Sequence, residues 1–302
     1  DVGYVTNPGD QFNNEGDNVS LQIEASDASE NLAYSASNLP PNLTINPTTG
    51  LITGVLASGS GSVFQEDSGL VVIEAESTDI VPDWATTTTG GAVGVIAGTN
   101  HLNNQNGGTL TYEIAINTPG VYRFNWRNFF SGSVPTDEND NWLRFPNSNG
   151  VWFFGYKGTP ASEAALIAEL EGAQNNIVFP VGSGRESAST LPEGASGNGF
   201  LKVYRAGGTS EVYDWQAKTS DNDAHDVYVR FENAGTYTME ISERSAGHAI
   251  DRIALYKVDG PAYTDSQLTN APESEVTPGN GAAGNSPYSV QVTVTDDGNP
   301  AL

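Results

Sequence analysis

Apolar and polar residues alternate over short stretches of this chain, which predicts β-strands rather than helices. Residues Val19–Ala25 alternate as a half-buried strand does. Shorter segments of the same kind lie at 32–35 and 43–45. Pro40-Pro41 and Pro47–Gly50 mark turns, because proline fixes φ and glycine supplies positive φ. The first sixty residues therefore predict a small β-unit.

A second β-rich region begins at Leu70–Glu76. The alternation predicts further strands at 109–116, 120–124, 141–145, 227–231, 235–241 and 249–256. One segment differs: Ala161–Gln174 is rich in alanine, has no glycine before Gly172, and places Leu166, Ile167 and Leu170 on one face. That pattern predicts one helix inserted in an otherwise all-β unit.

A late strand suggests that the first unit is split. Residues 19–54 alone leave an exposed sheet edge and little core. The strand Tyr288–Thr295 has no partner in its own neighbourhood, and pairing it with the first unit solves both problems. We expect one discontinuous domain at 1–59 and 284–302 and an inserted domain at 68–260. Gly-, Ser- and Pro-rich linkers are expected at 60–67 and 261–283.

Composition limits the classes of partner. The 302 residues include 37 acidic and 12 basic side chains, and the formal net charge is −25. A field of that sign repels nucleic acid and anionic membranes, and no apolar run is long enough to insert in a bilayer. There is no cysteine, which excludes disulfides and thiolate metal sites. The acidity indicates either a solvated surface or carboxylates that hold calcium. No signal peptide begins the chain, so we expect its targeting elements elsewhere in a longer protein.

The outer segments resemble the immunoglobulin-like or cadherin-like repeats that occur in tandem on bacterial surface adhesins. The resemblance covers about 75 residues, at 7–11, 15–17, 19–23, 25–27, 39–54 and 292–296. Repeats of this kind end with one more strand, which either lies beyond Leu302 or is missing. The resemblance implies neighbouring repeats of the same polypeptide and a secreted or cell-surface location.

The inserted segment resembles carbohydrate-binding modules of family 6 and their malectin-like relatives. The matching residues are 73–76 at the start, 249–255 at the end, and 119–124, 138–145 and 234–238 between them. The resemblance implies a β-sandwich jelly roll and does not identify the sugar. The expected fold is therefore all-β: an Ig/cadherin-like β-sandwich interrupted by an inserted jelly roll with one short helix.

Three carboxylates of the insert are candidate calcium ligands. Glu74 and Glu76 point to the same face of one strand, where they repel each other unless a cation or a basic partner lies between them. Asp251 lies on the closing strand, which pairs near the first in the resembled fold, and the resemblance implies a structural calcium there. The alternative is a pair of solvent-facing glutamates, with Asp251 bonded to Arg252 or to a turn amide.

A second calcium site is possible at a junction between repeats. Glu15, Asp296 and Asp297 resemble the acidic junction motifs of cadherin-like arrays, in which calcium stiffens the joint. The alternative is an ordinary Asx turn at 295–298.

Sugar binding requires flat aromatic faces and fixed polar groups, and loop positions offer both. Core packing is the alternative for each tryptophan, and a structurally satisfied histidine is the alternative for His248. The candidate ligand-binding residues are Trp126, Asn128, Trp84, Arg244, His248, Asn100 and Trp152.

No sequence pattern indicates catalysis: the chain lacks a zinc-protease motif, a nucleophile elbow and a phosphate loop. We expect a monomeric, non-enzymatic, calcium-dependent lectin-like region of a large bacterial adhesin, binding a cell-surface or matrix glycan in adhesion or biofilm formation. Two alternatives remain: a structural or peptide-binding adhesin module, and an accessory module of a polysaccharide-degrading enzyme.

Overall fold

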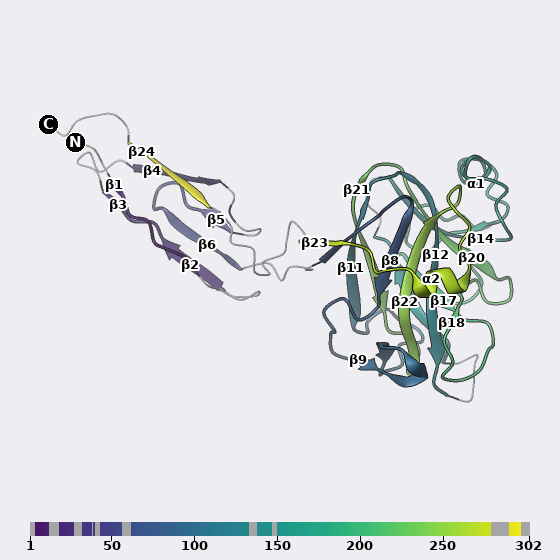
Figure 1. The fold of residues 1–302 in the computed structure, drawn as a ribbon. Helices are drawn as coiled ribbons and strands as arrows, with labels where there is room; N and C mark the ends of the chain where they lie inside the picture. Colours follow the sequence, from purple (N-terminus) through teal and green to yellow (C-terminus); the bar gives the residue numbers. More distant parts are fainter. Residues whose placement is uncertain are drawn as a thin grey trace. The chain divides into compact units, whose positions relative to one another are not determined.

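The computed structural model describes residues 4–11, 18–26, 32–37, 39, 43–55, 62–132, 138–146, 150–278 and 290–296. The chain divides into two compact units, one made of residues 1–62 and 278–302 and the other of residues 63–277. Both ends of the sequence therefore contribute to the smaller unit, and the larger unit is inserted between them (Figure 1).

The smaller unit brings the late strand beside an early one. β24 (Gln291–Asp296) pairs antiparallel with β4 (Leu32–Ser37), with Val292 opposite Ala36. The other strands of this unit are β1 (Tyr4–Val5) with β3 (Ala25–Ser26), and β2 (Asn18–Gln22) with β6 (Leu51–Val55) and β5 (Thr44–Ile45).

The turn between β5 and β6 packs against Tyr34 of β4. Gly50 has φ +70°, and a Cβ atom there would lie 2.5 Å from Cε1 of Tyr34, so the tyrosine ring packs against bare backbone. The amide of Tyr34 donates to the carbonyl of Pro47 at 2.8 Å. Ile23 and Ile52 are buried in this unit.

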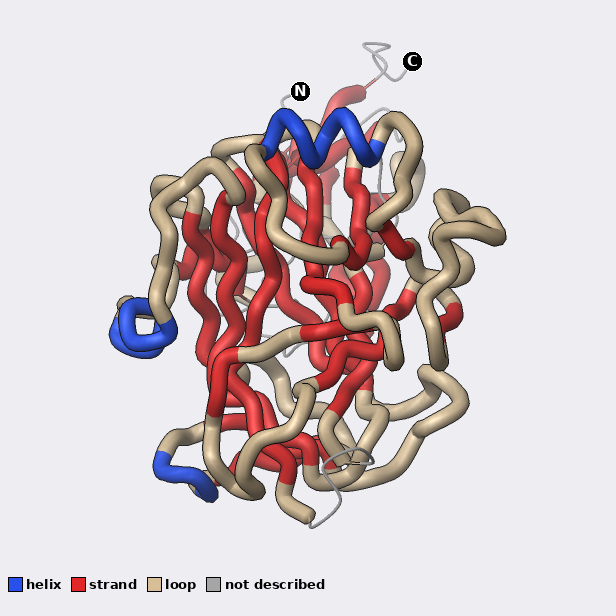
Figure 2. The backbone as a smooth tube through the Cα atoms, turned by 90° about the vertical axis from the view of Figure 1, so that its right-hand side faces the viewer, coloured by secondary structure: helices blue, strands red, loops and turns tan. Residues whose placement is uncertain are grey.

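The larger unit is a sandwich of two sheets with the main core between them, and strands are its main regular structure, joined by long loops (Figure 2). The first sheet is antiparallel throughout, because each neighbouring pair runs in opposite directions. Its order is β14 (Val151–Tyr156), β20 (His225–Phe231), β12 (Gly120–Phe130), β22 (His248–Lys257) and β8 (Leu70–Glu74).

The second sheet faces the first across the core. Its order is β7 (Ser62–Gln65), β11 (Thr109–Ile116), β21 (Gly235–Ser242), β13 (Asp140–Arg144) and β17 (Phe200–Tyr204). Short strands extend the two sheets: β9 (Trp84–Thr87), β10 (Gly94–Ala97), β15 (Ile177–Val178), β16 (Ser196–Gly197), β18 (Asp214–Trp215) and β19 (Lys218–Thr219). A single 3-10 turn, η1 (Thr89–Gly91), connects β9 to β10.

Two short helices cover the outer face of the first sheet, whereas the sequence pattern predicted one. α1 (Glu163–Leu170) lies within the predicted range and buries Leu166 and Leu170 against that face. α2 (Asp265–Asn270) lies in a segment expected to be a linker. Its six residues are too few for a helical period to show, and Leu268 alone is its buried anchor.

The segments expected to be linkers also contain strands of the larger unit. β7 buries Val63 and Phe64 in the core, and β23 (Val276–Pro278) runs beside β7, where Gln65 donates to the carbonyl of Glu275 at 2.8 Å. These strands are short and lie among polar residues, so composition did not reveal them. No helix in the described part of the chain is long and apolar enough to span a membrane.

Candidate functional site

Three loops meet at one end of the larger unit, and we call residues 81–84, 98–108 and 243–248 the loop end. Backbone hydrogen bonds tie the loops together: Gly98 donates to the carbonyl of Asp83 at 2.9 Å, and His101 donates to the carbonyl of Arg244 at 2.8 Å. The amide of Ala246 donates to Oδ1 of Asn100 at 2.9 Å. The loop end is therefore cross-linked by its own backbone.

Asp83, His101 and Glu243 form a three-residue cluster at the loop end. One ligand atom from each lies within 4.8 Å of the other two. Asp83 is exposed, with φ +78°, and leads into Trp84 at the start of β9. His101 is held from behind, because its carbonyl accepts from Nε1 of Trp142 at 3.0 Å. Glu243 follows β21 directly, so the sheet fixes its position.

Glu243 is buried and only half satisfied. Its Oε1 accepts from the amides of Gly98, at 2.6 Å, and Thr99, at 3.4 Å. Its Oε2 and Nε2 of His101 lie 3.9 Å apart, and within the described residues neither atom has a hydrogen-bond partner. Burial raises the pKa of Glu243, and the nearby Asp83 adds to the rise, whereas the bonds from Gly98 and Thr99 oppose it.

Three predicted ligand-binding residues are buried, and the structure corrects those assignments. Trp126 is 0% exposed in the core between the sheets, so no face of its ring can stack on a sugar. Asn128 and His248 are also 0% exposed. Nδ2 of Asn128 donates to the carbonyls of Trp126, at 3.2 Å, and Gln216, at 2.8 Å.

The surroundings of His248 fix its protonation. Nδ2 of Asn141 lies 2.7 Å from Nδ1 of His248, and Oδ1 of Asn128 lies 3.2 Å from Nε2. Oδ1 of Asn141 accepts from the amide of Arg244, so its Nδ2 donates to the ring, and the imidazole proton sits on Nε2. Burial lowers the pKa of His248 to about 3, and Arg205 adds to the decrease. His248 is a neutral core residue, the alternative that the sequence left open.

Three other predicted residues do lie at the loop end. Asn100 is exposed there. Trp84 is 6% exposed, and its Nε1 donates to the carbonyl of Gly108 at 2.8 Å. Arg244 is committed elsewhere: Nη1 donates to both oxygens of the buried Asp140 at 2.6 Å, and its guanidinium lies over the ring of Trp142. Asn100 is the freest of the three to meet a ligand.

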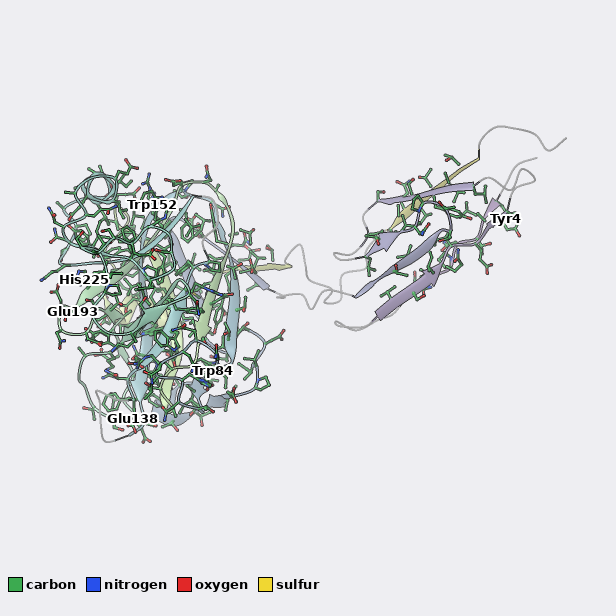
Figure 3. All side chains as sticks on the ribbon, turned by 180° about the vertical axis from the view of Figure 1, so that it is seen from behind. Tyr4, Trp84, Glu138, Trp152, Glu193 and His225 are labelled. Carbon is green, nitrogen blue, oxygen red and sulfur yellow. The ribbon has the colours of Figure 1, made fainter. Side chains whose placement is uncertain are left out.

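Trp152 lies at the opposite end of the unit from Trp84 (Figure 3). Cζ of Arg185 lies 3.6 Å from the centre of its ring, and its Nε1 donates to Oε1 of Glu232 at 3.0 Å. The guanidinium therefore covers a ring face that a sugar would need. The structure does not bring Trp152 together with the other predicted ligand-binding residues.

Of the three predicted calcium ligands, Glu74 ends β8 and Asp251 lies on β22, and both have arginine partners. Glu76 lies in the turn after β8, so the expectation that Glu74 and Glu76 share one face of a strand is wrong. Oε1 of Glu74 is 2.6 Å from Nη2 of Arg252, and Asp251 forms an ion pair with Arg127. Within the described residues, Oε2 of Glu76 is buried without a hydrogen-bond partner. Among the described residues, these three carboxylates do not share the 4.8 Å spacing of ligand atoms that the three-residue cluster has, and arginine side chains pair with two of them. Calcium at this position stays a prediction.

A fourth carboxylate, which the sequence reasoning missed, joins this group. Oε1 of Glu273 accepts from the amide of Glu74 at 3.0 Å. Burial raises the pKa of Glu74, Glu76 and Asp251, and mutual repulsion of the carboxylates adds to the rise for Glu74 and Glu76. We call the set the arginine-paired cluster: Glu74, Glu76, Asp251 and Glu273 with Arg127 and Arg252. Four negative and two positive charges leave a net charge of −2, which a divalent cation matches.

The proposed junction site falls mainly outside the described residues. Glu15 and Asp297 are not among them, and Asp296 is described only as the last backbone position of β24, opposite Leu32. This site stays a prediction.

Sequence reasoning also missed the three-residue cluster as a candidate metal site. A usable signal was present: His101 is one of three histidines in the chain, and it follows Asn100 in a polar loop. What sequence could not supply was the meeting of three loops that lie up to 160 positions apart, at 83, 101 and 243.

The fold is that of an immunoglobulin-like β-sandwich interrupted by a β-sandwich of the jelly-roll type. A family model described as Putative Ig domain matches residues 2–66, a minority of the chain. A search of the curated proteins finds no match.

Among solved structures, the chain is similar to a GH26-CBM35 β-(1,4)-mannanase from Podospora anserina, at 16% identity and a TM-score of 0.31, covering 66% of this chain and 29% of that one. It is similar to the C-terminal family 6 carbohydrate-binding module of LamC, a laminarinase from Zobellia galactanivorans, at 15% identity and a TM-score of 0.31, covering 62% and 99%. A third likeness is to an isomalto-dextranase of Arthrobacter globiformis T6 in complex with panose, at 9% identity and a TM-score of 0.33, covering 79% and 34%. The chain spans less than a third of the mannanase, and likenesses this weak do not decide what it binds.

Proposed function

We propose that the larger unit is a non-catalytic glycan-binding module, presented by a split immunoglobulin-like domain, and that it binds through the loop end. The observation that carries the proposal is the convergence of Asp83, Asn100 and His101 on loops fixed by backbone hydrogen bonds. Fixed polar groups of this kind read sugar hydroxyls without a large entropy cost on binding.

Rigidity at the loop end supports recognition. The side-chain carbonyl of Asn100 accepts from Ala246, which orients its amide group. Asp83 is exposed and offers acceptor oxygens on another loop of the same end, which the amide of Gly98 fixes by donating to the carbonyl of Asp83.

The test is binding of the full chain to a broad glycan array, followed by calorimetry with a positive glycan. We expect Asn100→Ala and Asp83→Asn each to weaken binding about tenfold, the effect of losing one or two well-placed hydrogen bonds. Asn222→Ala is the matched control, since Asn222 is exposed in the turn before β20. Wild-type affinity in both loop-end variants, with unchanged melting temperatures, would place the glycan site elsewhere.

A second candidate function is a structural adhesin module that binds no sugar. One observation favours it: none of the five tryptophans, all of which are described, is exposed. Aromatic platforms for a pyranose ring are therefore absent from these positions in this conformation. Silence across the array, from a protein that is folded by circular dichroism, would favour this second function.

We infer further that the module belongs to a large secreted adhesin of a bacterial surface, with calcium as a stabilising ligand. The family match at residues 2–66 supports the tandem-repeat context. The net charge of the arginine-paired cluster and the unsatisfied Oε2 of Glu76 support a cation beside Glu76. Calcium would require Glu74 or Asp251 to be shared with its arginine partner, so the melting temperature with calcium and with EDTA is the direct test.

A further inference from the structure

The three-residue cluster at the loop end contains two buried polar atoms that face each other without a partner. Oε2 of Glu243 belongs to a side chain that is 0% exposed, and Nε2 of His101 lies 3.9 Å from it. A distance of 3.9 Å is too long for a direct hydrogen bond, so a proton on either group satisfies neither atom. Buried polar atoms of this kind are rare in folded proteins and call for a bridging ligand.

The spacing suits a small cation. Ligand atoms around a tetrahedral zinc ion lie at about 2.0–2.2 Å from the metal, and hence about 3.4 Å from one another. The 3.9 Å between His101 and Glu243 exceeds this by about half an ångström, which a side-chain rotation can close. A carboxylate oxygen of Asp83 lies within 4.8 Å of one ligand atom of each of the other two residues.

The donor set distinguishes between metals. Calcium and magnesium take oxygen ligands, and calcium takes at least six, whereas an imidazole nitrogen favours zinc and its transition-metal neighbours. Two carboxylates and one histidine balance the charge of a divalent ion. No lysine or arginine in the described part of the chain forms an ion pair with Asp83 or Glu243.

The surroundings hold the ligands in place. Oε1 of Glu243 is fixed by the amides of Gly98 and Thr99, which leaves Oε2 to face the histidine. The backbone of His101 is anchored on both sides, by Arg244 and by the indole of Trp142. Such outer contacts orient metal ligands in proteins.

We propose that Asp83, His101 and Glu243 bind a divalent transition-metal ion, with zinc as the preferred metal, and that the ion ties three loops together. Three protein ligands leave a fourth position for water or for an oxygen of a bound ligand. The exposed Asp83 places that position on the solvent side. The site stands whether or not the loop end binds a glycan.

The experiment uses the full chain without a polyhistidine tag, stripped with EDTA and dialysed. Zinc is titrated by calorimetry in excess calcium and magnesium, which saturate weak sites on the acidic surface, and bound metal is counted by mass spectrometry. We expect one zinc per chain and a rise in melting temperature. Cobalt should give the visible absorption bands of a tetrahedral site.

Variants separate this site from the rest of the surface. His101→Gln and Glu243→Gln should each lower zinc affinity at least about tenfold. The matched controls are His225→Gln and Glu193→Gln, a histidine and an exposed glutamate at positions away from Trp84 (Figure 3). His101→Gln covers the case in which Glu243→Gln fails to fold, because the His101 side chain is 21% exposed.

Three results would overturn the proposal. The first is no stoichiometric zinc in the wild-type chain, which would leave a water molecule as the bridge. The second is zinc binding that His101→Gln leaves unchanged, which would assign the metal to surface carboxylates. The third is displacement of the bound zinc by equimolar calcium.

Discussion

Two clusters in the larger unit bring carboxylates close together, and they differ in what offsets the negative charge. In the arginine-paired cluster, Glu74 and Asp251 lie on the neighbouring strands β8 and β22, and Arg252 and Arg127 pair with them. Glu76 and Glu273 lie outside the strands, in the turn after β8 and in the segment before β23. In the three-residue cluster, the side chains come from loops, and Oε2 of Glu243 faces Nε2 of His101 at 3.9 Å. A regular sheet places opposite charges at fixed spacing, whereas converging loops leave a gap that another species can fill.

The comparison also shows how burial and pairing combine. Arg252 does two tasks: it pairs with Glu74, and its guanidinium donates to the carbonyls of Leu268, at 2.9 Å, and Ala271, at 2.9 Å, at the end of α2. That end of a helix carries unpaired carbonyls and a partial negative charge, both of which a guanidinium satisfies. The arginine-paired cluster is therefore partly a structural device for docking α2.

Removing Arg252 should have the largest effect. Arg252→Ala leaves Glu74 without its cation and exposes the carbonyls at the end of α2, so we expect a loss of about 3 kcal/mol or more in the free energy of unfolding. Urea unfolding measures it. Arg230→Ala is the control, because its partner Glu171 is half exposed, and its loss should stay below about 1 kcal/mol. Equal losses would show that Arg252 has no special structural role.

Adding calcium tests whether Arg127 and Arg252 alone neutralise enough of the negative charge in the arginine-paired cluster. If an ion binds beside Glu76, saturation at about 100 times the dissociation constant stabilises the fold by about 2.7 kcal/mol, and Glu76→Gln removes most of that gain. Differential scanning calorimetry with calcium and with EDTA is the measurement. A melting temperature that calcium leaves unmoved would mean that Arg127 and Arg252 are the only counter-ions.

Two histidines of the loop end differ in the same way. Both ring nitrogens of His248 have hydrogen-bond partners, whereas Nε2 of His101 has none among the described residues. The folded-state pKa of His248, about 3, lies below its ordinary value of about 6.5. As the pH falls, His248 is therefore protonated in the unfolded chain before it is protonated in the folded protein. Its contribution is present above pH about 6.5 and is lost as the pH falls towards 3, by about 1.4 kcal/mol for each pH unit. His248→Gln should flatten that part of the stability curve measured by urea unfolding. An unchanged slope would mean that carboxylates alone cause the acid sensitivity.

The smallest expected change in stability is at Asp83, and it separates a metal ligand from a residue that stabilises the fold. Asp83 is exposed, so Asp83→Asn should change the stability of the metal-free chain by less than about 0.5 kcal/mol, while lowering its zinc affinity. Thermal melts without zinc measure the stability of the variant, and melts with zinc measure how much of the zinc-dependent stabilisation it has lost. A large loss of stability without zinc would indicate that Asp83 has a structural role of its own.

The sequence indicates the burial of one predicted ligand-binding residue, Trp126, but not the orientation of Asn128. Tyr122, Phe124 and Trp126 alternate with Arg123 and Asn125, a period of two that places all three aromatic rings on one face. This alternation indicates a buried Trp126 if the strand continues past Phe124. The predicted strand ends at Phe124, whereas β12 continues to Phe130, so Trp126 is a core residue and not a loop residue. Beyond Arg127 the register shifts, so alternation could not have given the orientation of Asn128.

Local pattern in the sequence was enough to predict the long alternating strands, several turns, the helix α1 and a late strand at 288–295, observed as β24 at Gln291–Asp296, because backbone periodicity and turn chemistry are local. Which carboxylates meet arginines, and which do not, depends on the folded structure. Charge pairing depends on the register of neighbouring strands and on the meeting of distant loops. Asp83, His101 and Glu243 become one cluster only when the sandwich has closed.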